Sequence, residues 1–371
     1  MFNAVSRLVA CGLAALAIAA TSQAQAQLPP TGPIKPITGA DLKTAPLRLR
    51  PLPARIFPLM TGKGSMDGWT ALTDTATLGG ASLLTAYGHT DIITTGADGS
   101  LYAASFDPAA PALIASWVYQ PGGLVSEPHC GGYSKTGNPA DPVYILCAGL
   151  TAAGTAKLIA LDDHTGFNYE NAIDLGGKSG PAAPNFLTPP ALTFTASGWS
   201  HYFSYDVGVV VNGKIWQTHV RDADPATPWQ ALNETFRAAP VCARAVCYTP
   251  TANGSALRAL PFSDGNTAAV TFGAPLATSP DAPVALSGEV AFINVQANLA
   301  VVVARGADSQ LYQIAFDTAN KVFAGGWKPD GGIVPANSWP SCVAVNQKPV
   351  CVIQGPDGKL YAKTLQGATA L

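Results

Sequence analysis

The chain has 371 residues, of which 12% are charged, and its formal net charge at pH 7 is −2. It has no basic patch or stripe, so the sequence indicates no nucleic-acid partner. Thirty-seven glycines and thirty-one prolines suit a chain with many tight turns. Helical patterns are nearly absent after the N-terminal segment, so the composition favours an all-β protein.

Residues 1–26 have the organisation of a secretory signal peptide. Arg7 supplies the positive charge, residues 8–20 are almost wholly apolar, and Ala24 and Ala26 are small residues at the cleavage-determining positions. We expect cleavage after Ala26, and therefore a secreted or periplasmic protein without membrane insertion. The alternative, lipidation at Cys11, would leave only three apolar residues between Arg7 and this cysteine.

Residues 27–63 form a Pro-rich leader outside any repeat. Proline favours extended conformations and cannot join a central strand, so we expect a semi-rigid leader. Residues 64–371 are predicted to form one domain.

Three turn segments within this domain have nearly the same sequence. They are Gly96-Ala-Asp-Gly-Ser-Leu-Tyr102, Gly306-Ala-Asp-Ser-Gln-Leu-Tyr312 and Gly355-Pro-Asp-Gly-Lys-Leu-Tyr361. Each lies between an apolar run and an alternating stretch, as expected for the turn between two strands of a repeated β unit. Aspartate accepts hydrogen bonds from nearby amides and glycine supplies positive φ, so the repeated aspartates are interpreted as turn residues rather than ligands.

Aligning these turns predicts six units. The third strand of each unit begins near Leu101, Leu158, Ile215, Leu257, Leu311 and Leu360. Separations of about fifty residues are typical of four-stranded propeller blades. The last unit lacks a fourth strand, whereas the segment from Gly68 to Gly80 has a fourth-strand pattern and no preceding turn. We therefore predict a single β-propeller of six blades, in which an N-terminal strand completes the C-terminal blade. A seventh blade follows if residues 276–299 contain a degenerate unit.

The cysteines fall into the same register. Seven are present, and removing Cys11 with the signal peptide leaves six, an even number for an oxidising compartment. Residues opposite each other in an antiparallel pair are close enough for a disulfide. The spacing predicts three local bonds, namely Cys130–Cys147, Cys242–Cys247 and Cys342–Cys351. A metal site is the competing interpretation, but close-set cysteine pairs and companion histidines are missing, so we expect no metal and no cofactor.

Few residues stand out as candidates for chemistry. Glu127 and His129 precede and begin an inner strand, where they would line the central channel. Trp199 and His201 would form a small aromatic patch on the opposite face, and Trp339 lies in a loop entering a first strand. Each has a structural interpretation as well, as a satisfied polar residue or a packing aromatic. Glycoside hydrolysis needs two carboxylates about 5 to 10 Å apart, and the sequence shows no convincing partner for Glu127 among Glu170, Asp206, Glu234 and Glu289. We therefore assign no catalytic residue.

The pattern of residues 302–312, followed by Gly326-Trp327, Gly331-Gly332 and Pro340, resembles the repeat of the PLL-type (Photorhabdus-lectin-like) propellers, which are related in layout to fungal fucose-binding lectins. The resemblance implies binding of fucose or another glycan in clefts between blades. In this chain tryptophans do not recur from blade to blade, and an arginine before the turn glycine occurs once, at Arg305. A full ring of equivalent sugar sites is therefore not expected.

The sequence thus favours a secreted, lectin-like, non-enzymatic propeller that binds carbohydrate through aromatic inter-blade sites. Two alternatives stay open: an extracytoplasmic enzyme acting on polysaccharide, with Glu127 or His129 at the channel mouth, and a protein-interaction scaffold. The partner expected is a glycan, and the oligomeric state is not predicted.

Overall fold

The computed structural model describes residues 66–366, apart from 87–88, 135–142, 163–166, 177–190, 196–203, 212–213, 222–229, 236, 239, 244–245, 266–267, 273 and 337. All of these residues belong to one of two compact units, Thr44–Leu371. The signal peptide and the whole leader lie outside the described residues, so both remain predictions.

The described strands form six sheets, and five of them are each built from one continuous stretch of the chain. Sheet 1 contains β2 (Thr77–Ala86), β3 (His89–Gly96), β4 (Leu101–Asp107), β5 (Ala112–Leu113) and β6 (Val118–Gln120). Sheet 2 contains β7 (His129–Ser134), β8 (Val143–Leu150), β9 (Ala156–Asp162) and β10 (Asn168–Gly176). Sheet 3 contains β11 (Ala191–Thr195), β12 (Ser204–Val211), β13 (Lys214–Arg221) and β14 (Gln230–Thr235).

The remaining sheets follow the same plan. Sheet 4 contains β15 (Val241–Ala243), β16 (Val246–Pro250), β17 (Leu257–Gly265), β18 (Ala268–Phe272) and β19 (Ala277–Thr278). Sheet 5 contains β20 (Leu286–Gln296), β21 (Leu299–Gly306), β22 (Leu311–Asp317) and β23 (Val322–Gly331). Sheet 6 joins β1 (Thr70–Ala71) to β24 (Ser341–Val345), β25 (Lys348–Gln354) and β26 (Leu360–Thr364).

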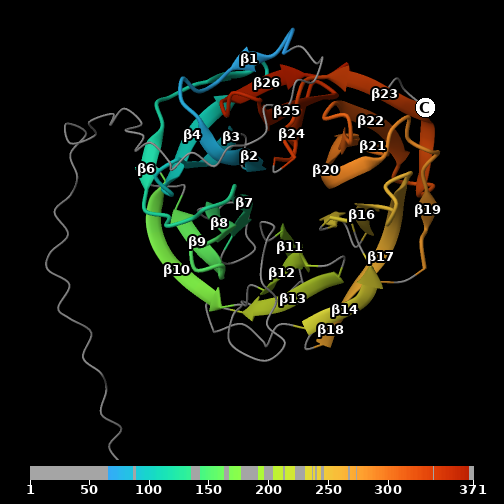
Figure 1. The fold of residues 1–371 in the computed structure, drawn as a ribbon, viewed down its shortest axis with the longest axis horizontal. Coiled ribbons are helices and arrows are strands. Elements are labelled where there is room, and N and C mark those ends of the chain that lie inside the picture. Colours follow the sequence, from blue (N-terminus) through green and yellow to red (C-terminus); the bar gives the residue numbers. More distant parts are fainter. Residues whose placement is uncertain are drawn as a thin grey trace, which may run out of the picture. The chain divides into compact units, whose positions relative to one another are not determined.

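The six sheets are arranged around a ring, as in a β-propeller (Figure 1). The first full strand of each sheet lies innermost, and neighbouring inner strands contact one another in the circular order β7, β2, β24, β20, β15, β11 and back to β7. In this order β7 and β20 lie on opposite sides of the ring. No helix occurs among the described residues. The prediction of an all-β propeller is confirmed.

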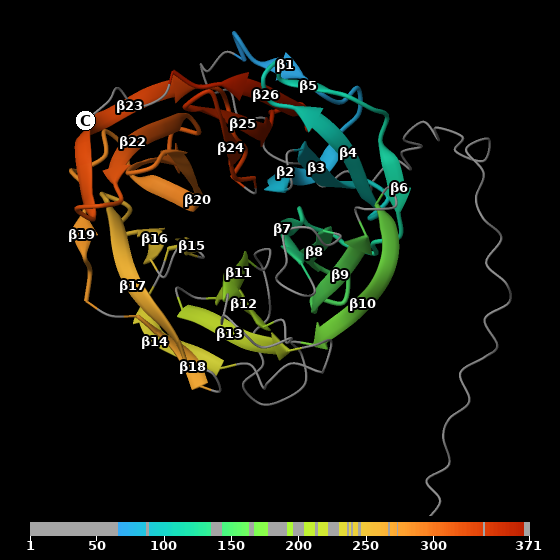
Figure 2. The same ribbon diagram turned by 180° about the vertical axis from the view of Figure 1, so that it is seen from behind.

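The ring closes by pairing the two ends of the domain. β1 pairs antiparallel with β26, with Thr70 opposite Ala362, and the two strands lie side by side in the rear view (Figure 2). β26 would otherwise present an unpaired edge. This is the closure that the sequence predicts. Residues 276–299, which left room for a seventh blade, instead form β19, the long β20 and the start of β21 within sheets 4 and 5.

The repeated turn makes hydrogen bonds within its own blade and to the segment that leads to the next blade. In the three repeated turn segments, which we call cassettes, Oδ1 of the aspartate accepts a hydrogen bond from the backbone N–H two residues later. The N–O distance is 3.0 Å for Asp98 and 3.1 Å for Asp308 and Asp357. The next residue has positive φ, whether glycine (Gly99, φ 80°) or serine (Ser309, φ 69°). Its carbonyl accepts from the segment that leads to the next sheet, as in Val334 N–H to Ser309 O at 2.9 Å. The turn therefore links one blade to the next.

The tyrosine that ends each cassette forms a hydrogen bond with the aspartate of the same turn. The Tyr312 hydroxyl donates to Asp308 Oδ2 at 2.7 Å, and Tyr102 and Tyr361 repeat the contact. Burial, the Asp308 hydrogen bond and its charge raise the pKa of Tyr312 to about 12. The carboxylate thus bonds both a backbone amide and a side chain of the following strand.

We expect Tyr312→Phe to lower the free energy of unfolding by about 1 kcal/mol, because one charge-assisted hydrogen bond is lost while the ring still packs. Urea unfolding measures the change. Tyr119→Phe is the control, since Tyr119 is 53% exposed and its loss should cost less than about 0.5 kcal/mol. Equal effects in the two variants would contradict this role of the aspartate.

Two predicted disulfides are present. Cys130–Cys147 and Cys342–Cys351 join directly opposed residues whose Cα atoms lie 4.0 and 4.1 Å apart. Cys247 is disulfide-bonded, and its partner in the strand register is Cys242, whose side chain lies outside the described residues. The Cys242–Cys247 bond therefore stays a prediction.

Apolar side chains fill the boundaries between sheets. One cluster between sheets 5 and 6 contains Trp69, Val301 and Ile353, and another between sheets 6 and 1 contains Leu72, Val352 and Ile92. Each blade therefore depends on its neighbours for much of its buried apolar surface. Among the described residues, no helix is long and apolar enough to cross a membrane.

Candidate functional site

Bulges at the start of two inner strands turn side chains and backbone toward the centre of the ring. In β2 the register jumps between Thr77 and Ala81, and in β20 it jumps between Ser287 and Val290. A bulge adds residues that have no partner on the neighbouring strand and re-aims their side chains. In β20 one of these residues is Glu289.

Glu127, just before β7, lies at this inner edge and is 4% exposed. Its Oε2 accepts from the backbone N–H of Gly80, and the amide of Trp339 donates to the same carboxylate. Because Gly80 belongs to sheet 1 and Trp339 precedes sheet 6, one carboxylate connects three neighbouring sheets. Burial raises the pKa of Glu127 to about 8, although both amide bonds act to lower it.

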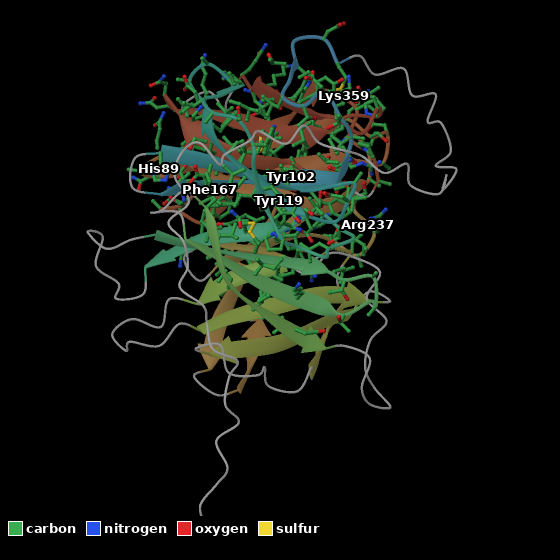
Figure 3. The ribbon with its side chains drawn as sticks, turned by 90° about the vertical axis from the view of Figure 1, so that its left-hand side faces the viewer. His89, Tyr102, Tyr119, Phe167, Arg237 and Lys359 are labelled. Atoms are coloured by element: carbon green, nitrogen blue, oxygen red, sulfur yellow. A yellow bond between two sulfur atoms is a disulfide. The ribbon has the colours of Figure 1, made fainter. Side chains whose placement is uncertain are left out.

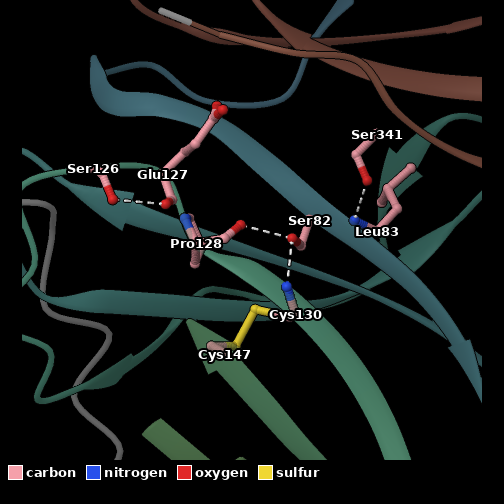
Figure 4. Close-up of a disulfide and its surroundings, with 8 residues drawn as sticks. All are labelled: Ser82, Leu83, Ser126, Glu127, Pro128, Cys130, Cys147 and Ser341. Atoms are coloured by element: carbon pink, nitrogen blue, oxygen red, sulfur yellow. Dashed lines mark hydrogen bonds between the residues drawn. A yellow bond between two sulfur atoms is a disulfide. The ribbon is translucent and has the colours of Figure 1, made fainter. Parts of the chain in front are cut away.

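Serine hydroxyls bond the same inner strands. Ser82 Oγ donates to Pro128 O at 2.7 Å and accepts from Cys130 N–H at 2.9 Å, while Leu83 N–H donates to Ser341 Oγ at 2.8 Å (Figure 4). In that view the Glu127 side chain points away from the Cys130–Cys147 disulfide. The inner strands of sheets 6, 1 and 2 are therefore held together by side chains.

His129 and Glu289 meet across the ring. His129 Nε2 lies 3.3 Å from Glu289 Oε2, and the Glu289 side chain is 5% exposed. Burial lowers the pKa of His129 to about 4. Burial, and then the charge of Glu127, raise the pKa of Glu289 well above its ordinary value. Because β7 and β20 are on opposite sides, this contact spans the propeller axis.

Polar atoms around this contact have no hydrogen-bond partner although they are buried. They are Glu127 Oε1, Ser338 Oγ, Trp339 Nε1 and His129 Nε2, whose 3.3 Å approach to Glu289 Oε2 is a close contact without hydrogen-bond geometry. We call Glu127, His129, Glu289, Ser338 and Trp339 the ring-centre cluster. No group of three or more His, Cys, Asp or Glu side chains in the described part of the chain is arranged to hold a metal ion.

The structure thus brings together three predicted site residues, Glu127, His129 and Trp339. Sequence reasoning missed Glu289 as their partner, because the two carboxylates are far apart in the chain and meet only through ring closure. The available signal was Gly288, a glycine directly before an acidic residue at the start of a strand, which is typical of a bulge.

The other predicted residues lie elsewhere. Arg305 on β21 is 4% exposed, and its guanidinium donates to Val334 O at 2.7 Å, to Ser309 Oγ at 2.8 Å and to Ser287 Oγ. These bonds tie the cassette turn to β20 and to the segment leaving sheet 5. Trp199 and His201 lie outside the described residues.

A second polar group lies at the junction of sheets 5 and 6. We call Trp69, Gln313, Asp330 and Lys363 the junction cluster. Gln313 Nε2 donates to Asp330 Oδ1 at 2.9 Å, and Lys363 Nζ donates to Asp330 O at 3.0 Å. The same ammonium lies 5.7 Å from the centre of the Trp69 ring, within the range of a cation–π contact.

The junction cluster also contains unsatisfied polar atoms. Trp69 Nε1, Gln313 Oε1 and Asp330 Oδ2 are buried without a hydrogen-bond partner. Asp330 is the extra residue of a bulge in β23, since Tyr312 pairs with Pro329 and Leu311 pairs with Gly331. Burial raises the pKa of Asp330 to about 6, while the Lys363 charge, the Gln313 hydrogen bond and a hydrogen bond from the backbone amide of Gln366 to the Asp330 carboxylate act in the opposite direction.

The junction of sheets 1 and 2 has a simpler arrangement. Lys157 Nζ donates to Gly122 O at 2.7 Å, as Lys363 does to Asp330. Tyr119 lies edge-to-face with Tyr102, with ring centres 5.9 Å apart, and the two side chains are neighbours in Figure 3. The carbonyl that accepts from Lys157 belongs to a glycine, so no carboxylate accompanies it.

Comparisons with known proteins give only distant similarities. No family model and no curated protein matches the sequence. A triple arginine-to-alanine mutant of AofleA from Arthrobotrys oligospora is 13% identical, covers 80% of this chain and 86% of its own, and has a TM-score of 0.48. A mutant Aleuria aurantia lectin in complex with alpha-methyl-L-fucoside is 12% identical over 81% and 98%, with a TM-score of 0.46. The BP39L lectin from Burkholderia pseudomallei is 18% identical over 76% and 79%, with a TM-score of 0.47. At these scores the similarities carry no argument about ligands.

Proposed function

We propose that this protein is an exported carbohydrate-binding propeller whose sugar site is the junction cluster. The observation that carries the proposal is the set of three buried polar atoms without partners, on Trp69, Gln313 and Asp330, beneath one lysine. Each such atom costs free energy until something bonds it.

The chemistry of the cluster suits a sugar. An indole N–H can donate to a hydroxyl oxygen, while the Gln313 and Asp330 oxygens can accept from hydroxyl groups. A sugar hydroxyl both donates and accepts, so one ring presenting several hydroxyls would satisfy all three atoms. Next to Asp330, a side chain at Gly331 would meet nothing within 4 Å, so the backbone there leaves room beside the carboxylate.

The ring-centre cluster supports a polysaccharide-cleaving enzyme less well. It does provide a pair of carboxyl groups, but Glu127 and Glu289 are both 4% exposed. Hydrolysis would require a sugar chain and a water molecule to reach these groups. Access to the junction cluster is less restricted, because Lys363 and Asp330 are half-buried, although Trp69 and Gln313 are only 8% and 2% exposed.

The test is a glycan array followed by calorimetry with the best binder. We expect Asp330→Asn and Lys363→Gln each to weaken binding about tenfold or more, because each removes one charge-assisted hydrogen-bonding group. Lys157→Gln is the control, since Lys157 also donates to a backbone carbonyl but at a junction without the carboxylate. Its affinity should equal that of the unmodified protein.

Two outcomes would refute the proposal. One is a glycan array with no binder above background. The other is a bound glycan whose affinity is unchanged in Asp330→Asn while the variant unfolds at the same temperature as the unmodified protein.

A further inference from the structure

The ring-centre cluster joins parts of the chain that no backbone pairing connects. Among the described residues no strand of sheet 2 pairs with a strand of sheet 5, yet His129 of β7 and Glu289 of β20 are 3.3 Å apart. Glu127, just before β7, accepts hydrogen bonds from the backbone amides of Gly80 and Trp339. Together these contacts connect sheets 5, 6, 1 and 2 at the axis.

Two buried carboxyl groups at the propeller axis cost much free energy when both are ionised. Each is buried, and the charge of Glu127 acts directly on Glu289. Neighbouring buried carboxyls cannot both ionise without a large cost, so one proton is retained by the pair. The two amide donors at the Glu127 carboxylate compensate for one negative charge, and the described residues provide no cation for a second.

The charged and titratable groups around the pair are few. β2 and residues 338–345 contain no ionisable side chain apart from disulfide-bonded Cys342. On β21, Arg305 reaches Ser287, two residues from Glu289, but its guanidinium is held by Val334, Ser309 and Ser287. On β16, which packs against β20, the Tyr248 phenol stacks on Phe292 farther along β20. His129 is the remaining group, and burial keeps it neutral above about pH 4.

We propose that Glu127, Glu289 and His129 form a proton-dependent clasp that holds the inner ends of four sheets together and loosens as the carboxyl pair loses its protons. The clasp is independent of the junction cluster and of carbohydrate binding. It would make opening of the propeller axis respond to the pH of the surroundings.

The sign of the effect follows from which state binds the proton more tightly. Burial raises the pKa of Glu127 from 4.5 to about 8, so its stabilising effect is complete below pH 4.5 and is lost as pH rises through 8. The pKa of His129 is lowered from 6.5 to about 4, so its contribution is lost as pH falls from 6.5 through 4. Between pH 6.5 and 9 the carboxyl pair acts alone.

Hydrogen exchange measured by mass spectrometry tests the clasp. After correction for the intrinsic pH dependence of exchange, peptides containing β2, β7 and β20 should exchange about tenfold faster at pH 9 than at pH 6.5 in the unmodified protein. In Glu127→Gln the ratio should fall to about one, because a glutamine oxygen accepts the same two amides and carries no proton to lose. Glu289→Gln should behave alike.

Asp281→Asn is the control, because Asp281 is an exposed carboxylate in the loop before β20, and it should keep the tenfold ratio. Infrared spectroscopy of the unmodified protein gives a reading that needs no variant. A protonated carboxyl band should be present at pH 6.5 and weaker at pH 9.

Any one of three results would overturn the clasp. They are the absence of that band at pH 6.5, a flat exchange profile in the unmodified protein, and an unchanged pH dependence in both glutamine variants. If Glu127→Gln fails to fold, the exchange ratio of Glu289→Gln and the infrared band of the unmodified protein test the clasp instead.

Discussion

Gly288→Ala is expected to destabilise the propeller by about 2–5 kcal/mol. Gly288 has φ +77°, a conformation that costs an alanine roughly 1–2 kcal/mol. An added Cβ would also overlap the six-membered ring of Trp339, and overpacking of this kind costs about 1–3 kcal/mol. The two costs fall on the same residue, because the bulge that aims Glu289 inward also lets Trp339 lie on the backbone.

Two other glycines separate these costs. Gly325 has φ +70° with nothing within 4 Å of an added Cβ, so Gly325→Ala should show the backbone cost alone, about 1–2 kcal/mol. Gly326 has neither positive φ nor a close neighbour, and Gly326→Ala should change stability by less than about 0.5 kcal/mol. Urea unfolding of the three variants gives the ranking. A Gly288→Ala protein as stable as Gly326→Ala would disprove the packing of Trp339 on this strand.

Removing residues 1–76 is expected to have a larger effect still. The deletion takes away β1, so the edge of β26 is left unpaired. It also removes Trp69 and Leu72 from the apolar clusters on either side of sheet 6. Burying one large apolar side chain is worth about 1.5–3 kcal/mol, and the side-chain bond from Leu360 N–H to Thr73 Oγ1 is lost as well.

We therefore expect the shortened chain to form no cooperatively unfolding monomer and to aggregate through the open edge. Circular dichroism during heating, together with size-exclusion chromatography, measures this. A chain that begins at residue 64 retains β1 and should unfold like the full-length protein. A shortened chain with an unchanged unfolding transition would show that β1 is dispensable for closure.

Much of the fold was readable from the sequence, because its cause is local. The Asp357-Gly358 turn is determined by the side-chain oxygen of one residue and the positive φ of the next, and both are properties of residue type. The Asn346–Gln347 turn, with φ of 48° and 65°, likewise places Cys342 opposite Cys351. The spacing between such turns predicts where each blade lies in the chain. The fourth-strand pattern near Trp69, which has no preceding turn, predicts that the N-terminal strand closes the ring.

Both polar clusters depended on contacts that no local pattern encodes. Trp69 has the ordinary sequence pattern of a packing residue, and it becomes part of a candidate site only because closure brings it beside Asp330 and Lys363. The position of Glu127 just before an inner strand follows from the sequence, but its partner Glu289 is contributed by the opposite side of the ring. The sequence by itself determined the strands, turns and blade order, since these follow from residue type and spacing. Only the tertiary structure decided which buried polar groups meet, because burial and charge act through space and not along the chain.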